Sequence, residues 1–412
     1  MWIASLLAAA VLHAAAPRAA QAPEQFVVVN IAHSPRAEVF EAVARAFPAA
    51  PGARRRVGVA GIFSYLHHPR EAMRADLEQF LRLAEHHDVP IVVQLDGEQW
   101  WGARPDLWNW WDPAQPGYDR RNRANVEWTG WGPEHAIRIA WRNWGRQIRV
   151  LPPPNLMSPA YQRAWREEMR RLVPLVMRWW RGLPEERRWL LIGIKVGWES
   201  SVGVNAWHYP GGARLAERPA EEDPTTGLRT DELPARGVEG IGYAAAWTAR
   251  IRRSGNLTEA DLAEVARRHL EELSRWAARL GVPRDRLFTH GAGWKEGELL
   301  YDAAVNRYAS PGWSFYRHAA NPMADTGVRR ALARSDAPWW AAVEWLYQGP
   351  DSVEAWRAAL ETTLADPRCR YLCIYNWEGI RENRAALDAI RLATGATPLS
   401  ATPGGPSGGG SR

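Results

Sequence analysis

The stretch WLLIGIKVGWESSVGVNAWHYPGG, residues 189–212, holds an apolar run that leads directly into Gly197, Trp198 and Glu199. Its first seven residues are mostly apolar, as expected of a strand that is buried on both faces of a parallel sheet. The pattern then gives way to Ser, Gly, Asn, Trp, His and Tyr. A carboxylate therefore stands where a buried strand ends and a polar loop begins.

Seven other apolar runs are similar to this one, and patterns typical of amphipathic helices separate or follow them. The eight expected strands cover residues 26–34, 57–66, 90–99, 189–199, 286–293, 312–319, 339–347 and 370–379. The expected helices cover residues 36–47, 70–87, 158–182, 258–280, 298–308, 324–334, 353–365 and 382–393. Eight alternating units without a phosphate-binding glycine turn predict the α/β architecture of a (β/α)8 TIM barrel. Without the fifth and sixth runs, whose strand pattern is weakest, an open sheet would result.

The composition is that of a globular domain with an unusual excess of tryptophan. The 412 residues carry a net charge of +6, and 25 of them are Trp against 7 Phe. The Arg residues are scattered along predicted helices, often beside Glu, so they indicate solvated helix faces and not a nucleic-acid track. Cys369 and Cys373 lie in one predicted strand, about 13 Å apart at ~3.3 Å per residue, and cannot pair with each other. The composition therefore indicates neither nucleic-acid binding nor a thiol fold.

The two ends of the chain differ in composition from the part between them. The apolar residues 2–16, followed by Ala20 and Ala22, predict a signal peptide over residues 1–22, because they are too few for a comfortable membrane span. The Gly-, Pro- and Ser-rich residues 394–412 predict a flexible tail. The barrel is expected over residues 23–393. On this interpretation the protein is secreted or periplasmic and has no membrane contact after the signal peptide is cleaved. The sequence does not predict an oligomeric state.

Polar residues follow the predicted strands at their carboxyl ends, where barrel proteins place their functional groups. They are His33, Tyr65, His67, His68, Asp96, Glu98, Glu199, His290, Tyr316, Arg317, His318, Glu344, Asn376 and Glu378. The longest connections, 100–157 and 200–257, follow the third and fourth strands and contain the Trp-rich sequences WWGARPDLWNWWDP and NAWHYPGG. We expect these connections to lie over one rim of the barrel, with two or three of the seven Trp residues of 100–131 facing a groove.

Two carboxylates that face each other across a barrel mouth suit glycoside hydrolysis. One of them protonates the leaving oxygen while the other attacks carbon or activates water. Indole rings pack on the C–H face of a sugar, and polar side chains bind its hydroxyls. In this layout the chain resembles clan A, the superfamily of (β/α)8 glycoside hydrolases that includes β-galactosidases, cellulases and mannanases. The resemblance covers the barrel layout of residues 26–393 and implies an exported hydrolase of a poly- or oligosaccharide, without a cofactor.

The resemblance also implies roles for individual residues. Glu199 of VGWES stands where clan A has its acid/base, at the end of the fourth strand. Glu344 of AAVEW stands where clan A has its nucleophile, at the end of the seventh. Tyr316 resembles the tyrosine that hydrogen-bonds the nucleophile, and Trp377 resembles the aromatic floor beneath the first sugar.

One departure from the clan A pattern concerns the residue before the acid/base. Clan A usually has Asn there, and this chain has Trp198, so contact with the sugar 2-hydroxyl falls to Asn205 or Asn376. β-Amylase-like barrels also have catalytic Glu residues after strands four and seven, without the Asn, and they invert configuration. We favour retention. The distance between the two carboxyl groups distinguishes the two mechanisms: it is about 5–5.5 Å in retaining enzymes and about 6.5–9.5 Å in inverting enzymes.

The two carboxyls are expected to have unequal environments. Trp198 and the aromatic loops would favour the protonated form of Glu199. Tyr316, with Arg317 or His318, would favour the ionised form of Glu344. The substrate-binding residues expected at the mouth are Asp96, Glu98, Trp100, Trp101, Asn205, Trp207, His208, His290, Tyr316, Asn376 and Trp377.

Several alternatives stay open from the sequence. Lys195 shares a strand face with Glu199, so it either forms an interior ion pair or tunes the pKa of a catalytic carboxylate. Glu378 is a second candidate for the partner of Glu199, or it caps the last helix. The histidines have no HxH or HExxH spacing, which favours hydrogen bonding over a metal site. A non-catalytic carbohydrate-binding barrel is the main competing function, and a metal-dependent barrel hydrolase would need His and Asp spacings that the sequence lacks.

Overall fold

The computed structural model describes residues 24–32, 34–48, 52–228 and 237–396. The predicted signal peptide, His33 and residues 397–412 of the predicted tail lie outside these ranges. No helix among the described residues combines the length and the apolar character that a membrane crossing requires.

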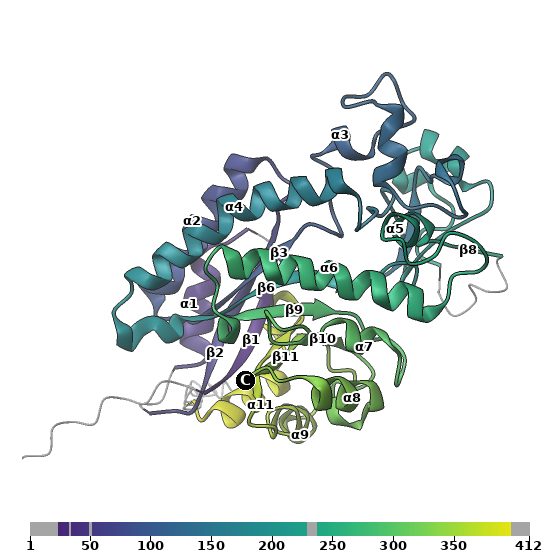
Figure 1. Ribbon diagram of the computed structural model, residues 1–412. Helices are drawn as coiled ribbons and strands as arrows, with labels where there is room; N and C mark the ends of the chain where they lie inside the picture. The colour runs from purple at the N-terminus through teal and green to yellow at the C-terminus, as the bar shows by residue number, and fades with distance from the viewer. Residues whose placement is uncertain (1–23, 33, 49–51, 229–236, 397–412) are drawn as a thin grey trace, which may run out of the picture.

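A closed barrel of eight parallel strands forms the centre of the protein (Figure 1). Its strands, in order around the barrel, are β1 (Gln25–Ile31), β2 (Arg55–Ser64), β3 (Ile91–Asp96), β6 (Leu191–Ser200), β9 (Leu287–Gly291), β10 (Gly312–Phe315), β11 (Trp340–Trp345) and β12 (Cys369–Ile374). All eight predicted strands are present, including the two with the weakest pattern, so the predicted barrel is confirmed. Strand β10 ends at Phe315, earlier than predicted, which leaves Tyr316 in the loop at the mouth.

The helices cover the outside of the barrel and largely match the prediction. They are α1 (Ala37–Ala46), α2 (Arg70–His87), α4 (Pro159–Gly182), α6 (Glu259–Arg279), α7 (Leu300–Ala303), α8 (Thr326–Arg334), α9 (Val353–Thr363) and α11 (Arg384–Thr394). Three shorter helices, α3 (Pro105–Trp108), α5 (Tyr243–Thr248) and α10 (Trp377–Ile380), lie in loops. Helix α7 is shorter than the predicted 298–308. The carbonyl of the Asn306 side chain accepts the backbone N–H groups of Tyr308 and Ala309, which holds this segment in a turn.

Local sequence explains where the long helices begin. Thr258 and Asp261 form the predicted capping box at the start of α6, in which each side chain accepts a backbone N–H of the other residue. The Ser158 hydroxyl caps α4 by accepting the N–H of Tyr161, and Ser352 caps α9 in the same way. These caps fix the helix ends against the barrel, and the strands in turn fix the direction of the residues at the mouth.

The two long connections fold together into a second, antiparallel sheet. Strands β4 (Ala140–Asn143) and β5 (Gln147–Val150) come from the first connection, and β7 (Ala206–His208) and β8 (Glu239–Gly240) from the second. Their order is β5-β4-β7-β8, and β4 pairs with β7 where Trp141 stands opposite Trp207. This sheet was not predicted, because strands of two to four residues give too little alternation to recognise. It joins the two connections, which follow the carboxyl ends of β3 and β6, over the same rim (Figure 1).

Two hydrophobic clusters stabilise the barrel. Side chains inside it include Phe26, Val92, Ile192, Phe288 and Tyr371, all at most 1% exposed. A larger cluster lies between the strands and the surrounding helices. Cys369 and Cys373 are both free and buried, in agreement with the predicted lack of a bond between them. The packed interior supports the strand ends, so that the polar groups at the mouth rest on a rigid base.

Candidate active site

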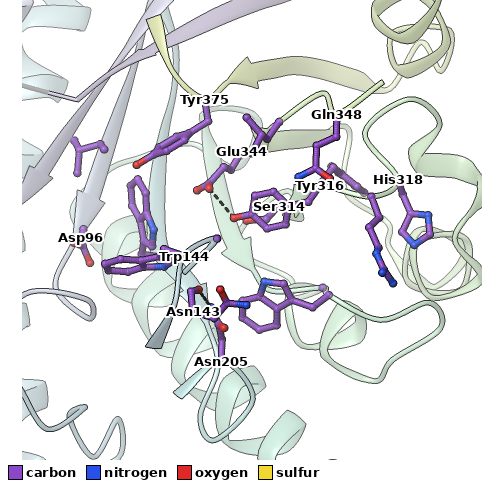
Figure 2. Close-up of a pocket in the computed structure, with 18 of the residues that line it drawn as sticks. Asp96, Asn143, Trp144, Asn205, Ser314, Tyr316, His318, Glu344, Gln348 and Tyr375 are labelled. Carbon is purple, nitrogen blue, oxygen red and sulfur yellow. Dashed lines mark hydrogen bonds between the residues drawn. The ribbon is translucent and has the colours of Figure 1, made fainter. Parts of the chain in front are cut away.

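A cavity of about 710 Å³ opens at the mouth of the barrel. Its wall includes Asp96 at the end of β3, Glu344 in β11, and Tyr316 and Tyr375 just beyond β10 and β12. The loop sheet contributes Asn143 and the neighbouring Trp144, and Asn205 precedes β7 (Figure 2). The volume lies within the roughly 300–1,000 Å³ typical of small-molecule sites.

A bulge in β6 brings the buried Glu199 next to two residues of the cavity wall, Trp198 before it in the chain and Tyr316, which hydrogen-bonds it, although Glu199 does not itself line the cavity. The register between β6 and β9 shifts between Val196 and Ser200, and Gly197 has a φ of +83°. A Cβ on Gly197 would lie 2.6 Å from the Ser200 Oγ, so the close turn requires glycine here. Glu199 itself has a φ of +45°, in the left-handed region. Such a conformation costs on the order of 1 kcal/mol or more in a residue with a side chain, and it is typical of residues held in place for a function.

Glu98 stabilises the bulge through contacts to one oxygen of its carboxylate. Its Oε1 accepts a hydrogen bond from the Ser200 hydroxyl at 2.7 Å and from the Trp198 N–H at 3.3 Å. The His269 Nε2 from α6 lies 3.0 Å from the same oxygen. Glu98 is therefore buried between the residues on either side of Glu199. Glu98 does not line the cavity, and its predicted contact with substrate stays a prediction.

Glu199 and Glu344 form a close pair through one hydroxyl. The Tyr316 Oη lies 2.5 Å from the Glu199 Oε1 and 2.6 Å from the Glu344 Oε1. Figure 2 shows Tyr316 and Glu344 on the same wall of the cavity, joined by this hydrogen bond. One oxygen from each carboxyl lies within 4.8 Å of the other. A phenol has a single hydrogen to donate, so the second short contact requires a hydrogen on one of the carboxyls. The geometry thus fits a pair that shares one proton.

The surroundings of Glu199 act on its pKa in opposite directions. Burial raises the pKa of Glu199, and hydrogen bonds from Tyr316 and Ser314 counteract that rise. The charges of Arg142 and Lys195 also lower the pKa of Glu199. The net direction is upward, as predicted, although burial as a whole and not Trp198 alone is the cause.

The environment of Glu344 differs from the prediction. Burial, followed by the charge of Glu199, raises the pKa of Glu344 to about 8. Its Oε2 is buried without a hydrogen-bond partner among the described residues. Tyr316 contacts both carboxyls, and the His318 Nε2 lies 3.5 Å from Asp325 instead of facing Glu344. Tyr316 favours the ionised form of Glu344, as predicted, but burial and the charge of Glu199 outweigh it, so the net direction for Glu344 is toward the protonated form.

A chain of buried polar groups lies beneath the pair. The Lys195 ammonium donates to the His290 Nδ1 at 2.7 Å, and the opposite nitrogen, Nε2, lies 2.7 Å from the Ser314 Oγ. Burial lowers the pKa of Lys195 to about 8 and that of His290 well below its usual value. His290 is accordingly neutral, with Nδ1 accepting and Nε2–H donating to Ser314. The Lys195 Nζ also lies 3.5 Å from the centre of the Trp198 ring.

This chain of buried groups bears on two alternatives that the sequence left open. The hydrogen-bond partner of Lys195 is an imidazole and not a carboxylate, and its charge lowers the pKa of both Glu199 and Glu344, so the tuning role is favoured over a direct ion pair. One atom each of Glu199, His290 and Glu344 lie within 4.8 Å of one another, which is close enough for a metal ion. Both nitrogens of His290 are engaged, so the imidazole as arranged has no free lone pair for a metal.

Three other residues predicted to bind substrate line the cavity, namely Asp96, Trp100 and Asn205. The Asp96 carboxylate accepts the Ser64 hydroxyl at 2.9 Å, and burial raises the pKa of Asp96. His290 is fully buried, and its Nε2 lies 2.7 Å from the Ser314 Oγ and 4.0 Å from the Glu344 Oε2. It is therefore placed to orient the site and does not face the substrate.

Five residues predicted to bind substrate have other roles in the structure. The Trp101 and Trp207 indoles are buried and donate to the Pro152 carbonyl and the Gln147 side chain. His208 pairs with Glu239, and Asn376 caps α10 by accepting the Gly379 N–H. Trp377 packs against Phe47, with ring centres 6.5 Å apart. None of these five residues, Trp101, Trp207, His208, Asn376 and Trp377, lines the cavity described above, and their predicted contacts with substrate stay predictions.

The predicted aromatic groove exists, but its members differ. Of the seven Trp residues in 100–131, Trp100 lines the cavity, and the other indoles there are Trp144, Trp198 and Trp294. Tyr375, two residues before Trp377, lines the cavity, whereas Trp377 does not. The position of Tyr375 follows from strand alternation, since Tyr371 and Cys373 both face the barrel interior. Glu378 accepts the Ala32 N–H at the end of β1 and is not part of the cavity wall.

The fold and the site define the protein as a (β/α)8 barrel with a buried carboxyl pair at its mouth. No family model and no curated protein matches the sequence. Among solved structures, a mannanase from Bacillus subtilis is 10% identical with a TM-score of 0.43, over 91% of this chain and 86% of that one. A thermostable mutant of a xylanase from Cellvibrio japonicus is 9% identical with a TM-score of 0.42, over 90% and 96%. A β-mannanase from the blue mussel Mytilus edulis is 9% identical with a TM-score of 0.41, over 90% and 92%. These likenesses concern the overall fold.

Proposed function

We propose that the protein is a glycoside hydrolase that cleaves a poly- or oligosaccharide with retention of configuration. The observation that supports this most directly is the spacing of Glu199 and Glu344, whose carboxyl oxygens come within 4.8 Å of each other. Retaining enzymes have carboxyl groups about 5–5.5 Å apart, whereas inverting enzymes leave about 6.5–9.5 Å for a water molecule. The spacing favours direct attack by a carboxylate over the β-amylase-like alternative.

In the proposed first step, a Glu344 oxygen attacks the anomeric carbon while Glu199 gives its proton to the leaving glycosidic oxygen. The C–O bond to the leaving sugar breaks, and a glycosyl ester forms on Glu344. In the second step, Glu199 takes a proton from water, whose oxygen attacks the anomeric carbon and releases Glu344. The proton that the two short Tyr316 contacts require on one of the carboxyls is the one that this cycle needs. Placing it on Glu199 follows the clan A resemblance, and the opposite placement is an outcome of the test below.

Tyr316 and Lys195 support this chemistry from two sides. The Tyr316 hydroxyl contacts both carboxyls, so it can stabilise whichever of them is ionised at a given step. The Lys195 charge lowers the pKa of both groups and so limits the rise that burial causes. Together they keep a fully buried pair with one charge and one proton.

The lining of the cavity supports a sugar as the ligand. Trp100 and Trp144 lie with ring centres 5.3 Å apart, and Asn143 and Asn205 offer amides beside them. Indole faces and amide groups are what a pyranose ring requires. We further propose that the enzyme is exported, on the basis of residues 1–22. Amino-terminal sequencing of the protein recovered outside the cytoplasm would test that point by locating the cleavage site.

A screen of soluble polysaccharides for released reducing ends tests the function. Wild type is expected to release reducing sugar from at least one glycan, and Glu199→Gln and Glu344→Gln to lose at least about 1,000-fold of that rate. Glu378→Gln is the matched control, because it changes a Glu at the same rim that lies outside the cavity wall. Glycan binding without release by any of these proteins would favour the non-catalytic carbohydrate-binding barrel instead.

A further inference from the structure

A second cavity of about 490 Å³ adjoins the first, and Trp100 lines both. Two more indoles of its wall, Trp108 and Trp111, have ring centres 5.5 Å apart and an angle of 32° between their planes. The volume again falls in the range of small-molecule sites. The reaction proposed above does not use this cavity.

We propose that the second cavity binds a further part of the same glycan chain, so that the substrate is a polysaccharide that crosses Trp100 between the two cavities. This inference rests on the proposed function for its substrate. It explains why the chain places Trp100, one of the few large apolar side chains exposed at the surface, on the wall between two hollows. An exposed indole that lines two adjoining cavities is a surface on which a chain of sugars can pack.

The surroundings of Trp100 support this path. Its ring lies 5.3 Å from that of Trp144 on the side of the first cavity and 5.6 Å from that of His67 on the side of the second. Burial and the neighbouring His68 lower the pKa of His67, so this ring is neutral at physiological pH. A continuous row of uncharged rings therefore joins the cavities.

The second cavity is also preformed. The Asn109 side-chain amide donates to the carbonyls of Asp112, Gln115 and Pro116 at 2.9, 3.2 and 3.1 Å, which fixes the loop that carries Trp111. The Trp108 indole donates to the Trp101 carbonyl at 3.2 Å. Rings held in this way lose little conformational entropy when a ligand binds. This low cost favours the binding of a ligand that makes only weak contacts, such as a sugar.

The charges of the second cavity favour an uncharged ligand. The Arg149 guanidinium donates to the carbonyls of Leu215 and Arg218, so both of its outer nitrogens are already engaged. Asp112 adds one negative charge to the same wall, and its Oδ1 accepts the Ala114 N–H. Among the described residues of this wall, one Arg stands against one Asp, so neither sign of charge predominates. The indole N–H of Trp111 has no hydrogen-bond partner among the described residues, so it can donate to a sugar hydroxyl.

Affinity electrophoresis tests the proposal without relying on catalysis. Proteins run in native gels that contain galactomannan, arabinoxylan, mixed-linkage β-glucan, hydroxyethylcellulose or laminarin, all in a Glu344→Gln background so that the gel is not digested. Trp111→Ala is expected to weaken retardation by the bound glycan about five-fold or more. The control is Trp247→Ala, which removes an exposed indole from outside both cavities. Equal retardation of Trp111→Ala and Trp247→Ala, or no retardation by any glycan, would overturn the proposal.

A second variant and a kinetic measurement guard against a folding defect. Ala220→Trp introduces a large side chain at an exposed position in the wall of the second cavity and removes no packed ring. With oligosaccharides of increasing length, wild-type kcat/KM should rise until both cavities are spanned. In Trp111→Ala and Ala220→Trp, kcat/KM should stop rising at a shorter oligosaccharide length. For the shortest oligosaccharides, kcat/KM of these variants should differ from wild type by less than about two-fold. An equal loss at every length would contradict the second cavity, whereas no hydrolysis by wild type in any assay would count against the proposed function alone.

Discussion

Replacing Tyr316 with Phe isolates the hydroxyl that joins the two carboxyls. The change removes hydrogen bonds of 2.5 and 2.6 Å to Glu199 and Glu344 and leaves the ring in place. A hydrogen bond to a charged group contributes about 1.5–3 kcal/mol, so kcat/KM should fall about 10- to 100-fold. The hydroxyl also lowers the pKa of both carboxyls, and its loss should raise them.

The pH dependence of kcat/KM reports this second effect. In wild type the rate should decline as pH rises through about 8, where the pair loses its proton. In Tyr316→Phe the decline should move upward by about one pH unit, since one unit corresponds to ~1.4 kcal/mol. The control is Tyr375→Phe, because Tyr375 lines the same cavity and has no hydrogen bond to either carboxyl within the described ranges. An alkaline limb that stays in place, with a rate within three-fold of wild type and an unchanged Tm, would refute the shared hydroxyl.

Three further changes probe the parts around the pair. Gly197→Ala should lower the free energy of unfolding by about 1–3 kcal/mol in urea titration, because the new Cβ meets Ser200; Gly52→Ala, with φ +72° and no neighbour within 4 Å, should cost less. Lys195→Met removes a charge that lowers the pKa of both carboxyls, so the alkaline limb of kcat/KM should move to higher pH; an unchanged limb would exclude the tuning role. Burial raises the pKa of Glu127 from 4.5 to about 8, so between these pH values the folded protein holds a proton that the unfolded chain has released. The free energy of unfolding should therefore fall as pH rises from 4.5 to 8, by up to ~1.4 kcal/mol per pH unit. Glu127→Gln should reduce that fall in urea titrations at pH 5 and 8, and equal slopes would contradict it.

The barrel could be predicted from the sequence because each of its strands is a continuous apolar run. Such a run is buried on both faces, and the helix after it has a 3.6-residue pattern of its own. Glu199 and Glu344 could be predicted as strand-end residues for the same reason. The bulge at Gly197 could not be predicted, because it depends on the contacts of Glu98 and Ser200 across two strands.

The loop residues could be predicted least. Trp101 and Trp144 both belong to Trp-rich segments, yet one indole is buried against Pro152 and the other lines the cavity. The difference arises from the sheet that joins the two connections, whose strands are too short to recognise. The protonation state of Glu199 and Glu344 could not be predicted from the sequence either. It depends on a hydroxyl that lies between two oxygens, and the sequence suggested that Tyr316 serves one of them.

Azide rescue tests the central claim about Glu199 and Glu344 most directly. In Glu344→Gly, azide should enter the space of the lost nucleophile, restore turnover of an activated aryl glycoside, and give a glycosyl azide of inverted configuration. In Glu199→Gly, azide should instead attack the ester on Glu344, so the product keeps the configuration of the substrate. Proton NMR of the two products distinguishes these outcomes. The account predicts inversion for Glu344→Gly and retention for Glu199→Gly; the exchanged result would reverse the roles, and rescue of neither variant would contradict a retaining mechanism at this pair.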